Sequence, residues 1–364
     1  MKARLIVFVI LNSSFLLSAF AGSATWSGNP ISSDWNTAEN WTPNTVPNSE
    51  TDIATFGTSV LTQVSLTDTH VDLGSMVFSP GANEFTITGA NGGFGFYGDG
   101  VVNNSGEIQQ FVLDSDIGIT FNNSASAGDA SVTYSLSGSG GMSFFDTSSA
   151  GAANFTVADG GLSTAILFYG SSDGDATASS ATFNILTGGT VHFDFGSTPA
   201  FGAFIVDGGT LYFTYLRGAK KSTIVCKNGG TVLLYITDGD NSTITCNQGG
   251  RVTFESSSAG NAQITADGGS TSDNDSGVID LKNADGENAL FLIEGGVGAR
   301  TSGAKLIMHG DSSAENAQVI INGGSFGGQG GSIHFLDLAD TGARIRKNLR
   351  LRLPGVRAGP KGAF

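Results

Sequence analysis

Short runs of alternating apolar and polar residues fill the chain between about residues 150 and 336, and they flank a recurring Gly-Gly pair. The apolar positions before the pairs are Phe155/Val157, Phe183/Ile185, Phe204/Val206, Ile224/Cys226, Ile244/Cys246, Ile264/Ala266, Phe291/Ile293 and Val319/Ile321. Those after them are Val191/Phe193, Leu211/Phe213, Val232/Leu234, Val252/Phe254, Ile279/Leu281, Leu306/Met308 and Ile333/Phe335. Side chains of a strand alternate between its two faces, so the pattern predicts strands with one buried face.

The Gly-Gly pairs begin at residues 160, 188, 208, 229, 249, 268, 295 and 323, with steps of 19 to 28 residues. Several pairs follow an Asp or Asn, which is typical of turns that need a positive φ. Repeats of this length indicate a solenoid. Hairpins would not place the same residue type at the same slot of each unit. We therefore predict an all-β fold, a right-handed parallel β-helix with coils of about 20–28 residues.

In such a helix, equivalent residues of successive coils lie about 4.8 Å apart. The first apolar positions of the units should then form one internal column, comprising Phe155, Phe183, Phe204, Ile224, Ile244 and Ile264. Cys226 and Cys246 are 20 residues apart, and both fall in an inward slot. They are interpreted either as a disulfide or as a reduced pair of stacked thiols.

Polar segments rich in Ser, Ala, Gly and Asp recur out of phase with the glycines, and we expect them at the outer corners of the coils. They lie within residues 119–134, 142–157, 165–185, 278–293 and 305–321. The front of the chain differs, because it holds all three tryptophans, Trp26, Trp35 and Trp41. The end of a solenoid needs a cap. We favour a tryptophan cap over an aromatic sugar-binding platform.

The two ends of the chain have their own patterns. Residues 1–21 combine Lys2 and Arg4 with an apolar stretch and a small-x-small site, which predicts a secretory signal peptide. Residues 341–364 are basic, and we interpret them as a truncated or aberrant tail rather than a basic arm. Between them we expect an N-terminal cap and first coil at 22–90, then β-helix repeats at 91–340.

Composition and charge narrow the functions. Glycine contributes 54 of the 364 residues and charged residues only 13 %, so a charge-rich disordered chain is excluded. The formal net charge of -15 argues against a nucleic-acid partner. No apolar run after the signal is long enough to span a membrane as a helix, so we expect no transmembrane segment in the mature chain.

Candidate chemistry is sparse, and we assign no catalytic, cofactor-binding or metal-binding residue. His192 and His334 occupy equivalent outward slots, as does Asp280, and we interpret the two histidines as solvated residues of a strand face. Acidic clusters at 238–241 and 273–275 contain oxygen ligands suited to calcium but lack a known calcium-loop spacing. We interpret them as solvated turns.

The Trp segment carries a family resemblance through Asp34-Trp35-Asn36, Asn40-Trp41-x-Pro43, Val46-Pro47 and Asp52-x-Ala54-x-Phe56. Together with the Ser-, Ala- and Gly-rich corners and the Gly-Gly strands that follow, this segment resembles the autotransporter-associated β-strand repeat proteins of bacteria. The resemblance implies a secreted or cell-surface β-helical passenger, often adhesin-like. The chain departs from an autotransporter because its last 24 residues lack the alternating strands of a membrane barrel.

We therefore expect a monomeric structural or adhesive protein that contacts glycans or other cell surfaces at many points. Two alternatives stay open at this stage. One is a polysaccharide hydrolase or lyase built on a β-helix. The other is a fragment of a larger passenger without independent activity.

Overall fold

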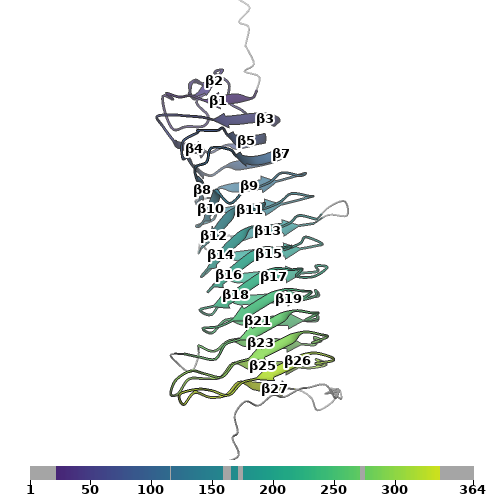
Figure 1. The fold of residues 1–364 in the computed structure, drawn as a ribbon. Helices are drawn as coiled ribbons and strands as arrows, with labels where there is room; N and C mark the ends of the chain where they lie inside the picture. Colours follow the sequence, from purple (N-terminus) through teal and green to yellow (C-terminus); the bar gives the residue numbers. More distant parts are fainter. Residues whose placement is uncertain (1–21, 115, 159–164, 171–174, 271–274, 337–364) are drawn as a thin grey trace, which may run out of the picture.

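The computed structural model describes residues 22–114, 116–158, 165–170, 175–270 and 275–336. The predicted signal peptide and basic tail lie outside the described residues. The described chain is built from strands, apart from one 3-10 turn at Ala38–Asn40. Figure 1 shows the strands stacked one above another along a single long axis, as the predicted solenoid requires.

The strands form two sheets that alternate along the chain. The sheet that we call the odd sheet holds β1 (Ala24–Trp26), β2 (Trp41–Thr42), β3 (Ser49–Phe56), β5 (His70–Phe78), β7 (Gly93–Asn103), β9 (Gly118–Phe121), β11 (Gly141–Phe144), β13 (Ala165–Tyr169), β15 (Thr190–Asp194), β17 (Thr210–Thr214), β19 (Thr231–Tyr235), β21 (Arg251–Glu255), β23 (Val278–Lys282), β25 (Lys305–His309) and β27 (Ser332–Leu336).

The even sheet holds β4 (Gln63–Thr67), β6 (Thr86–Ala90), β8 (Gln109–Leu113), β10 (Val132–Leu136), β12 (Asn154–Val157), β14 (Thr182–Leu186), β16 (Ala203–Asp207), β18 (Thr223–Lys227), β20 (Thr243–Cys246), β22 (Gln263–Ala266), β24 (Leu290–Ile293) and β26 (Gln318–Ile321). From β3 onward each strand pairs in parallel with the next strand of its own sheet, and β1 pairs in parallel with β3, whereas β2 pairs only with β1 and runs antiparallel to it. A parallel β-solenoid is thus confirmed. Its right-handed winding stays a prediction.

The predicted internal column is confirmed in register. Phe183 pairs with Phe204, Phe204 with Ile224, and Ile224 with Ile244. All four side chains are buried. Burying one such side chain contributes about 1.5–3 kcal/mol, so the repeated columns supply the stability that a globular core gives other proteins.

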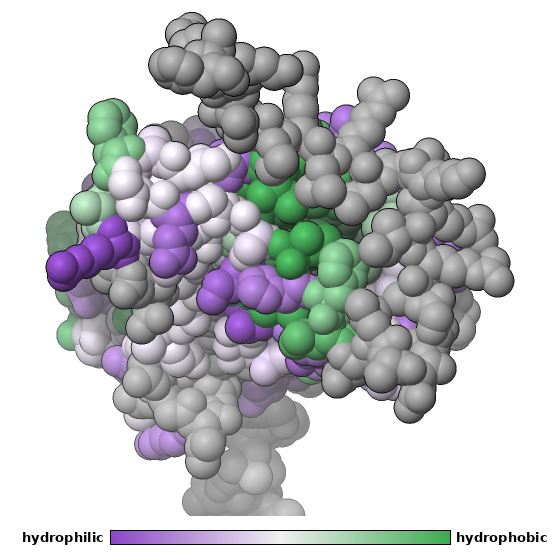
Figure 2. Space-filling view, turned by 90° about the horizontal axis from the view of Figure 1, so that it is seen from below, coloured by the Kyte–Doolittle hydropathy of each residue, from purple (hydrophilic) through white to green (hydrophobic). Residues whose placement is uncertain are grey.

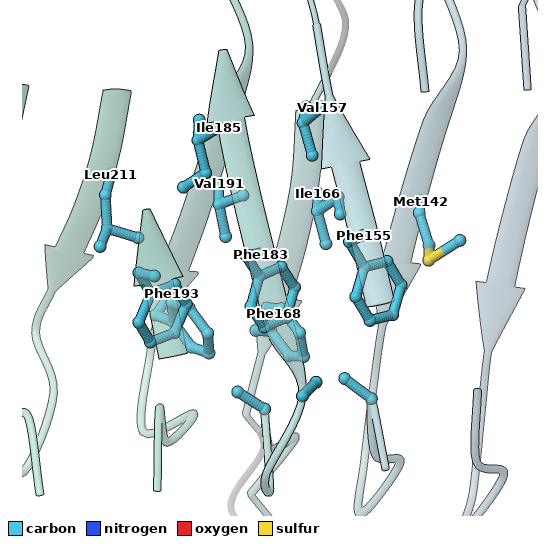
Figure 3. Close-up of a cluster of buried hydrophobic side chains, with 14 of the residues drawn as sticks. Met142, Phe155, Val157, Ile166, Phe168, Phe183, Ile185, Val191, Phe193 and Leu211 are labelled. Atoms are coloured by element: carbon cyan, nitrogen blue, oxygen red, sulfur yellow. The ribbon is translucent and has the colours of Figure 1, made fainter. Parts of the chain in front are cut away.

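The odd sheet contributes a second internal column, which faces the first. Phe144, Phe168 and Phe193 stack with ring centroids 4.4 and 4.3 Å apart and interplanar angles of 4°. Phe193 meets Phe204 of the even sheet edge to face at 5.6 Å. Figure 3 shows the rings of Phe168 and Phe193 near that of Phe183, with the aliphatic side chains beside them. The two sheets therefore share one continuous apolar interior.

The Gly-Gly pairs that the structure describes lie between an even strand and the next odd strand, as predicted, whereas the pair at 160–161 lies outside the described residues. Gly208 and Gly229 have φ values of 78° and 76°, a region that residues with a Cβ seldom adopt. A Cβ at Gly230 would collide with the carbonyl oxygen of Val206 in the coil before. The longer units at the C-terminal end carry extended loops, joined by a single bridge between Val297 and Ser325.

The polar segments form the outer corners between an odd strand and the next even strand, as predicted. Single parallel bridges link them from coil to coil, for example Ser149 to Thr177 and Thr177 to Thr198. We call the outer surface of these connections the corner face, and in the central coils it comprises residues 195–202, 215–222 and 236–242. It forms a narrow third side beside the two sheets.

Cys226 and Cys246 pair in register, and both are free, buried thiols. The reduced pair is therefore confirmed, and the disulfide interpretation is wrong. The two side chains occupy equivalent interior positions of adjacent coils, where a thiol packs as a small apolar group. Burial raises the pKa of Cys226 to about 12, so this thiol stays protonated at neutral pH.

All three tryptophans are buried over the first coils, at 2, 0 and 1 % exposure for Trp26, Trp35 and Trp41. The Trp35 and Trp41 ring centroids lie 4.7 Å apart, and Trp41 packs on Phe56 at 5.8 Å. The Trp41 indole nitrogen donates a hydrogen bond to the Trp35 carbonyl oxygen at 2.8 Å. The cap is confirmed. A sugar platform built from these rings is excluded, because their faces do not reach solvent.

The opposite end of the solenoid is seen in Figure 2, where hydrophobic residues gather near the centre and polar residues border them. Within the described part of the chain, no helix is long and apolar enough to cross a membrane.

Candidate functional site

The outward slots predicted for the histidines are confirmed by the register of the odd sheet. His192 pairs with Tyr212 of the next coil, and His334 pairs with Ile307. The His192 Nε2 atom lies 2.9 Å from the Thr214 hydroxyl, and its ring meets Tyr212 at 5.5 Å. Partial burial lowers the pKa of His192 despite the opposing charge of Asp194. His192 is thus half-buried rather than fully solvated, while His334 is exposed.

Asp280 shares this outward column, between Thr253 and Ile307, but it is not solvated. Its residue is only 3 % exposed. Arg251 donates a hydrogen bond to Oδ2 at 2.8 Å, and the His309 Nε2 atom lies 2.9 Å from Oδ1. Asp280 therefore pairs with His309 rather than with His192 or His334, and the Oδ1 atom accepts no hydrogen bond in this geometry.

Two further acids lie at the ends of adjacent even strands. Asp267 and Glu294 follow Ala266 and Ile293, which pair in register. Burial raises the pKa of Asp267, and the negative charge of Glu294 raises it further. Asn322 donates hydrogen bonds to both carboxylate oxygens of Glu294, each at 2.9 Å. A carboxyl with a raised pKa thus neighbours a second carboxyl whose two oxygens accept hydrogen bonds from an amide.

The predicted oxygen clusters give no assembled metal site among the residues that are described. Asp238 accepts a hydrogen bond from the backbone of Asp240, and Asp240 lies 3.4 Å from the Lys220 amine. Asp273 and Asn274 lie outside the described residues. Nowhere in the described ranges do three or more His, Cys, Asp or Glu residues gather as metal ligands would.

A row of aromatic rings, three of them exposed, crosses four successive coils at the edge between the odd sheet and the corner face. We call it the outer ring row, and it consists of Tyr169, Phe195, Tyr215 and Tyr235. Successive centroids lie 5.5, 5.8 and 5.6 Å apart. The first three residues are 39, 57 and 48 % exposed. Large rings exposed in a continuous row are uncommon on a protein surface, and this row is therefore a candidate binding site.

Backbone conformation makes the row more unusual. Phe195, Tyr215 and Ile236 stand two residues after the inward positions of Phe193, Phe213 and Leu234, and their φ values are 41°, 54° and 48°. In other coils the same slot holds residues that tolerate positive φ, namely Asn123, Asp146 and Asn283. Bulky residues at such positions store backbone strain, and strain of this kind concentrates at functional sites.

A recess of about 340 Å³ opens on the same corner face. Phe201 lines it together with Lys220 and Lys221, and the Lys221 amine lies 6.0 Å from the centre of the Phe201 ring. Phe201 is 66 % exposed. Asp240 and Asn241 of the next coil complete the lining. An aromatic face with amine, carboxylate and amide groups around it suits a polar ligand that also has an apolar face.

Sequence reasoning missed both features. The interpretation of the corners as polar turns ignored the aromatic residues that begin them. The signal was present as an aromatic or branched residue directly after the second strand of three successive units, at Phe195, Tyr215 and Ile236. A turn that begins with Phe or Tyr where neighbouring units use Asn or Asp could have identified the row.

In comparisons with known proteins, no protein-family model, no curated protein and no solved structure matches the chain. The molecule is thus defined by its own architecture: a parallel β-solenoid with a tryptophan cap at its N-terminal end.

Proposed function

We propose that this protein is an exported adhesive scaffold that binds glycans at cell surfaces through repeated contacts along the solenoid. The outer ring row is the observation that carries the proposal. Its three exposed rings are held on adjacent coils, so a long ligand meets a contact at each coil spacing. Weak contacts on a stiff support add up to firm attachment when several engage together.

Glycans fit the row because a sugar ring has an apolar face of C–H groups and a rim of hydroxyls. Aromatic side chains offer a flat apolar surface with a polar edge, and Tyr215 and Tyr235 also offer hydroxyl groups. The nearby Tyr215 raises the pKa of Tyr235 above its ordinary value, so the Tyr235 hydroxyl remains a hydrogen-bond donor at neutral pH.

Export and surface location rest on the sequence pattern of residues 1–21 and on the family resemblance of the tryptophan segment. We infer membership of the autotransporter-associated β-strand repeat group from that segment. Trp35, Trp41 and Phe56 belong to the motif that carries the resemblance, and all three are buried in the cap. This burial supports the inference, because it gives the motif residues a structural role.

The test is a glycan-array and cell-binding assay of the full exported chain, compared with Phe195→Asn and Tyr215→Asn. We expect both variants to fold and to lose most binding, because Asn suits the positive φ but offers no ring. Phe326→Asn is the matched control, since Phe326 is also exposed and has a φ of 52° but lies in a distant loop. Equal binding by all four proteins would overturn the proposal.

A second candidate is hydrolysis of a polysaccharide, favoured by the pair Asp267 and Glu294. Glycosidases use two carboxyl groups, one of them with a raised pKa, to divide the acid and base roles. Release of reducing sugar from a bound polysaccharide, lost in Asp267→Asn and in Glu294→Gln, would establish it. Binding without release of sugar by the unmodified protein would exclude it for the polysaccharide tested.

A further inference from the structure

The corner face concentrates positive charge on an acidic protein. Only eight Lys and Arg residues lie between residues 22 and 340, and three of them are Arg217, Lys220 and Lys221. All three belong to the connection between β17 and β18. This connection begins at Tyr215, so the basic residues and the outer ring row belong to the same surface.

Two of these cations form no ion pair, although carboxylates lie in the same region of the surface. Lys220 lies 3.4 Å from Asp240, and its amine also donates a hydrogen bond to the Arg217 carbonyl oxygen at 3.2 Å. Arg217 and Lys221 are both exposed, and neither forms an ion pair with any residue that the structure describes. A charge left unpaired beside an aromatic surface is available to a ligand of opposite sign.

The positions of the two cations suit a chain that crosses the corner face. Arg217 lines a shallow groove with Leu216 and Ile236, two residues after Tyr215 of the outer ring row. Asp238 and Asp285 line the same groove, so Arg217 is the group in it that attracts an anion. Lys221 lies over Phe201 at the other end of the same connection. Two cations, Arg217 and Lys221, thus lie between an aromatic contact at Tyr215 and a second one at Phe201.

We propose that the corner face binds an acidic polysaccharide, with sugar rings on the aromatic side chains and anionic groups on Arg217 and Lys221. This inference rests on the proposed function and specifies its ligand. The guanidinium of Arg217 can bind a carboxylate or a sulfate through two parallel hydrogen bonds. The net negative charge of the protein repels a polyanion elsewhere on the surface. The basic residues of the corner face therefore decide where the polysaccharide binds.

The experiment measures binding of the full exported chain to alginate, to dextran sulfate and to neutral dextran, at low and at physiological salt. Alginate carries carboxylates and dextran sulfate carries sulfates, so the pair distinguishes the two anionic groups. The variants are Arg217→Gln, Lys221→Gln and the double substitution. Lys305→Gln is the control, because Lys305 is exposed on the odd sheet in β25, away from the corner face.

We expect at least one acidic polymer to bind more tightly than dextran, and the double variant to weaken that binding by about tenfold, the combined effect of two exposed charge contacts. Higher salt should weaken it as well. Lys305→Gln should bind like the unmodified chain. The folded state of each variant is checked by circular dichroism, since both replaced side chains are exposed.

Three outcomes would overturn the inference. Equal binding of dextran and alginate, unaffected by the charge substitutions, would leave a neutral glycan site and the adhesive function intact. An equal loss in Lys305→Gln would show unspecific attraction. Tighter binding of a single-stranded oligonucleotide through the same two residues would assign the surface to nucleic acid. Loss of all glycan binding in Phe195→Asn together with normal cell binding would instead count against the proposed function.

Discussion

Two rows of aromatic rings cross successive coils at the odd sheet, one inside the solenoid and one outside, at or just after the strand ends. Phe193 and Phe195 show the contrast, because they are two residues apart and are 0 % and 57 % exposed. The inner ring stacks on Phe168 at 4.3 Å and the outer ring lies 5.8 Å from Tyr215. Both rows repeat with the coil, yet the fold requires only the inner one.

The reason lies in the backbone at each position. Phe193 stands within a regular strand, where a large apolar side chain fills the interior and follows the alternation of faces. Phe195 has a φ of 41°. The equivalent positions of two other coils hold Asn123 and Asp146, and these residue types adopt a positive φ more readily. An aromatic side chain there gains little from burial, so a contact outside the solenoid explains it better than stability does.

The largest expected effect concerns the inner row. Phe193→Ala removes a ring that touches Phe168, Phe204 and Phe213 and leaves a cavity, which destabilises the protein by about 3–5 kcal/mol. Thermal and urea unfolding monitored by circular dichroism measure the change. Phe195→Ala is the matched control, and a similar loss of stability there would erase the distinction between the two rows.

A smaller effect of opposite sign is expected beside the outer row. Ile236 is a β-branched residue at a φ of 48°, and its backbone nitrogen donates a hydrogen bond to the Glu255 carbonyl oxygen at 3.2 Å. Ile236→Asn keeps this hydrogen bond and relieves the strain, so we expect a gain of about 1 kcal/mol in the free energy of unfolding.

The comparison for this gain is Asn283→Ile, the reverse exchange in an equivalent slot. It should destabilise the protein by a similar amount in the same urea titration. If both substitutions lower stability, side-chain packing rather than backbone strain governs the slot, and the argument from strain to function fails.

The inner row could be predicted from the sequence because alternation and repeat length leave one arrangement that buries every apolar slot. The register of Phe183 with Phe204 follows directly from their equivalent places before the glycines. The stacked Cys226 and Cys246 follow in the same way, but their redox state does not, because spacing alone allows both.

The surface features could not be predicted so well. The burial of Asp280 depends on Arg251 and His309, which belong to two other coils and approach it only once the coils are stacked. The outer ring row depends on a positive φ at Phe195 and Tyr215, and the sequence at those positions argues against that conformation. The backbone of the repeating coil imposes the positive φ there against the conformational preference of Phe and Tyr, so a prediction from residue type alone fails.

The smallest expected effect concerns His192, on the outer face of the odd sheet. His192 packs against Tyr212 and Thr214 outside the solenoid, and His192→Ala should change the free energy of unfolding by less than about 0.5 kcal/mol at pH 7. Binding of glycans and any release of reducing sugar should stay unchanged, since this side chain lies outside both the outer ring row and the acid pair.

The pH dependence of the same variant sharpens the test. Burial lowers the pKa of His192, so the unfolded chain takes up a proton at a higher pH than the folded chain does. The contribution of His192 to stability is therefore present above the ordinary histidine pKa of about 6.5 and decreases as the pH falls toward its lower folded value. Relative to the unmodified protein, His192→Ala should gain stability between pH 7 and pH 5, within this small range. A relative loss over that interval would show that the protonated ring is held by a partner, and His192 would then belong with the charged groups of the surface.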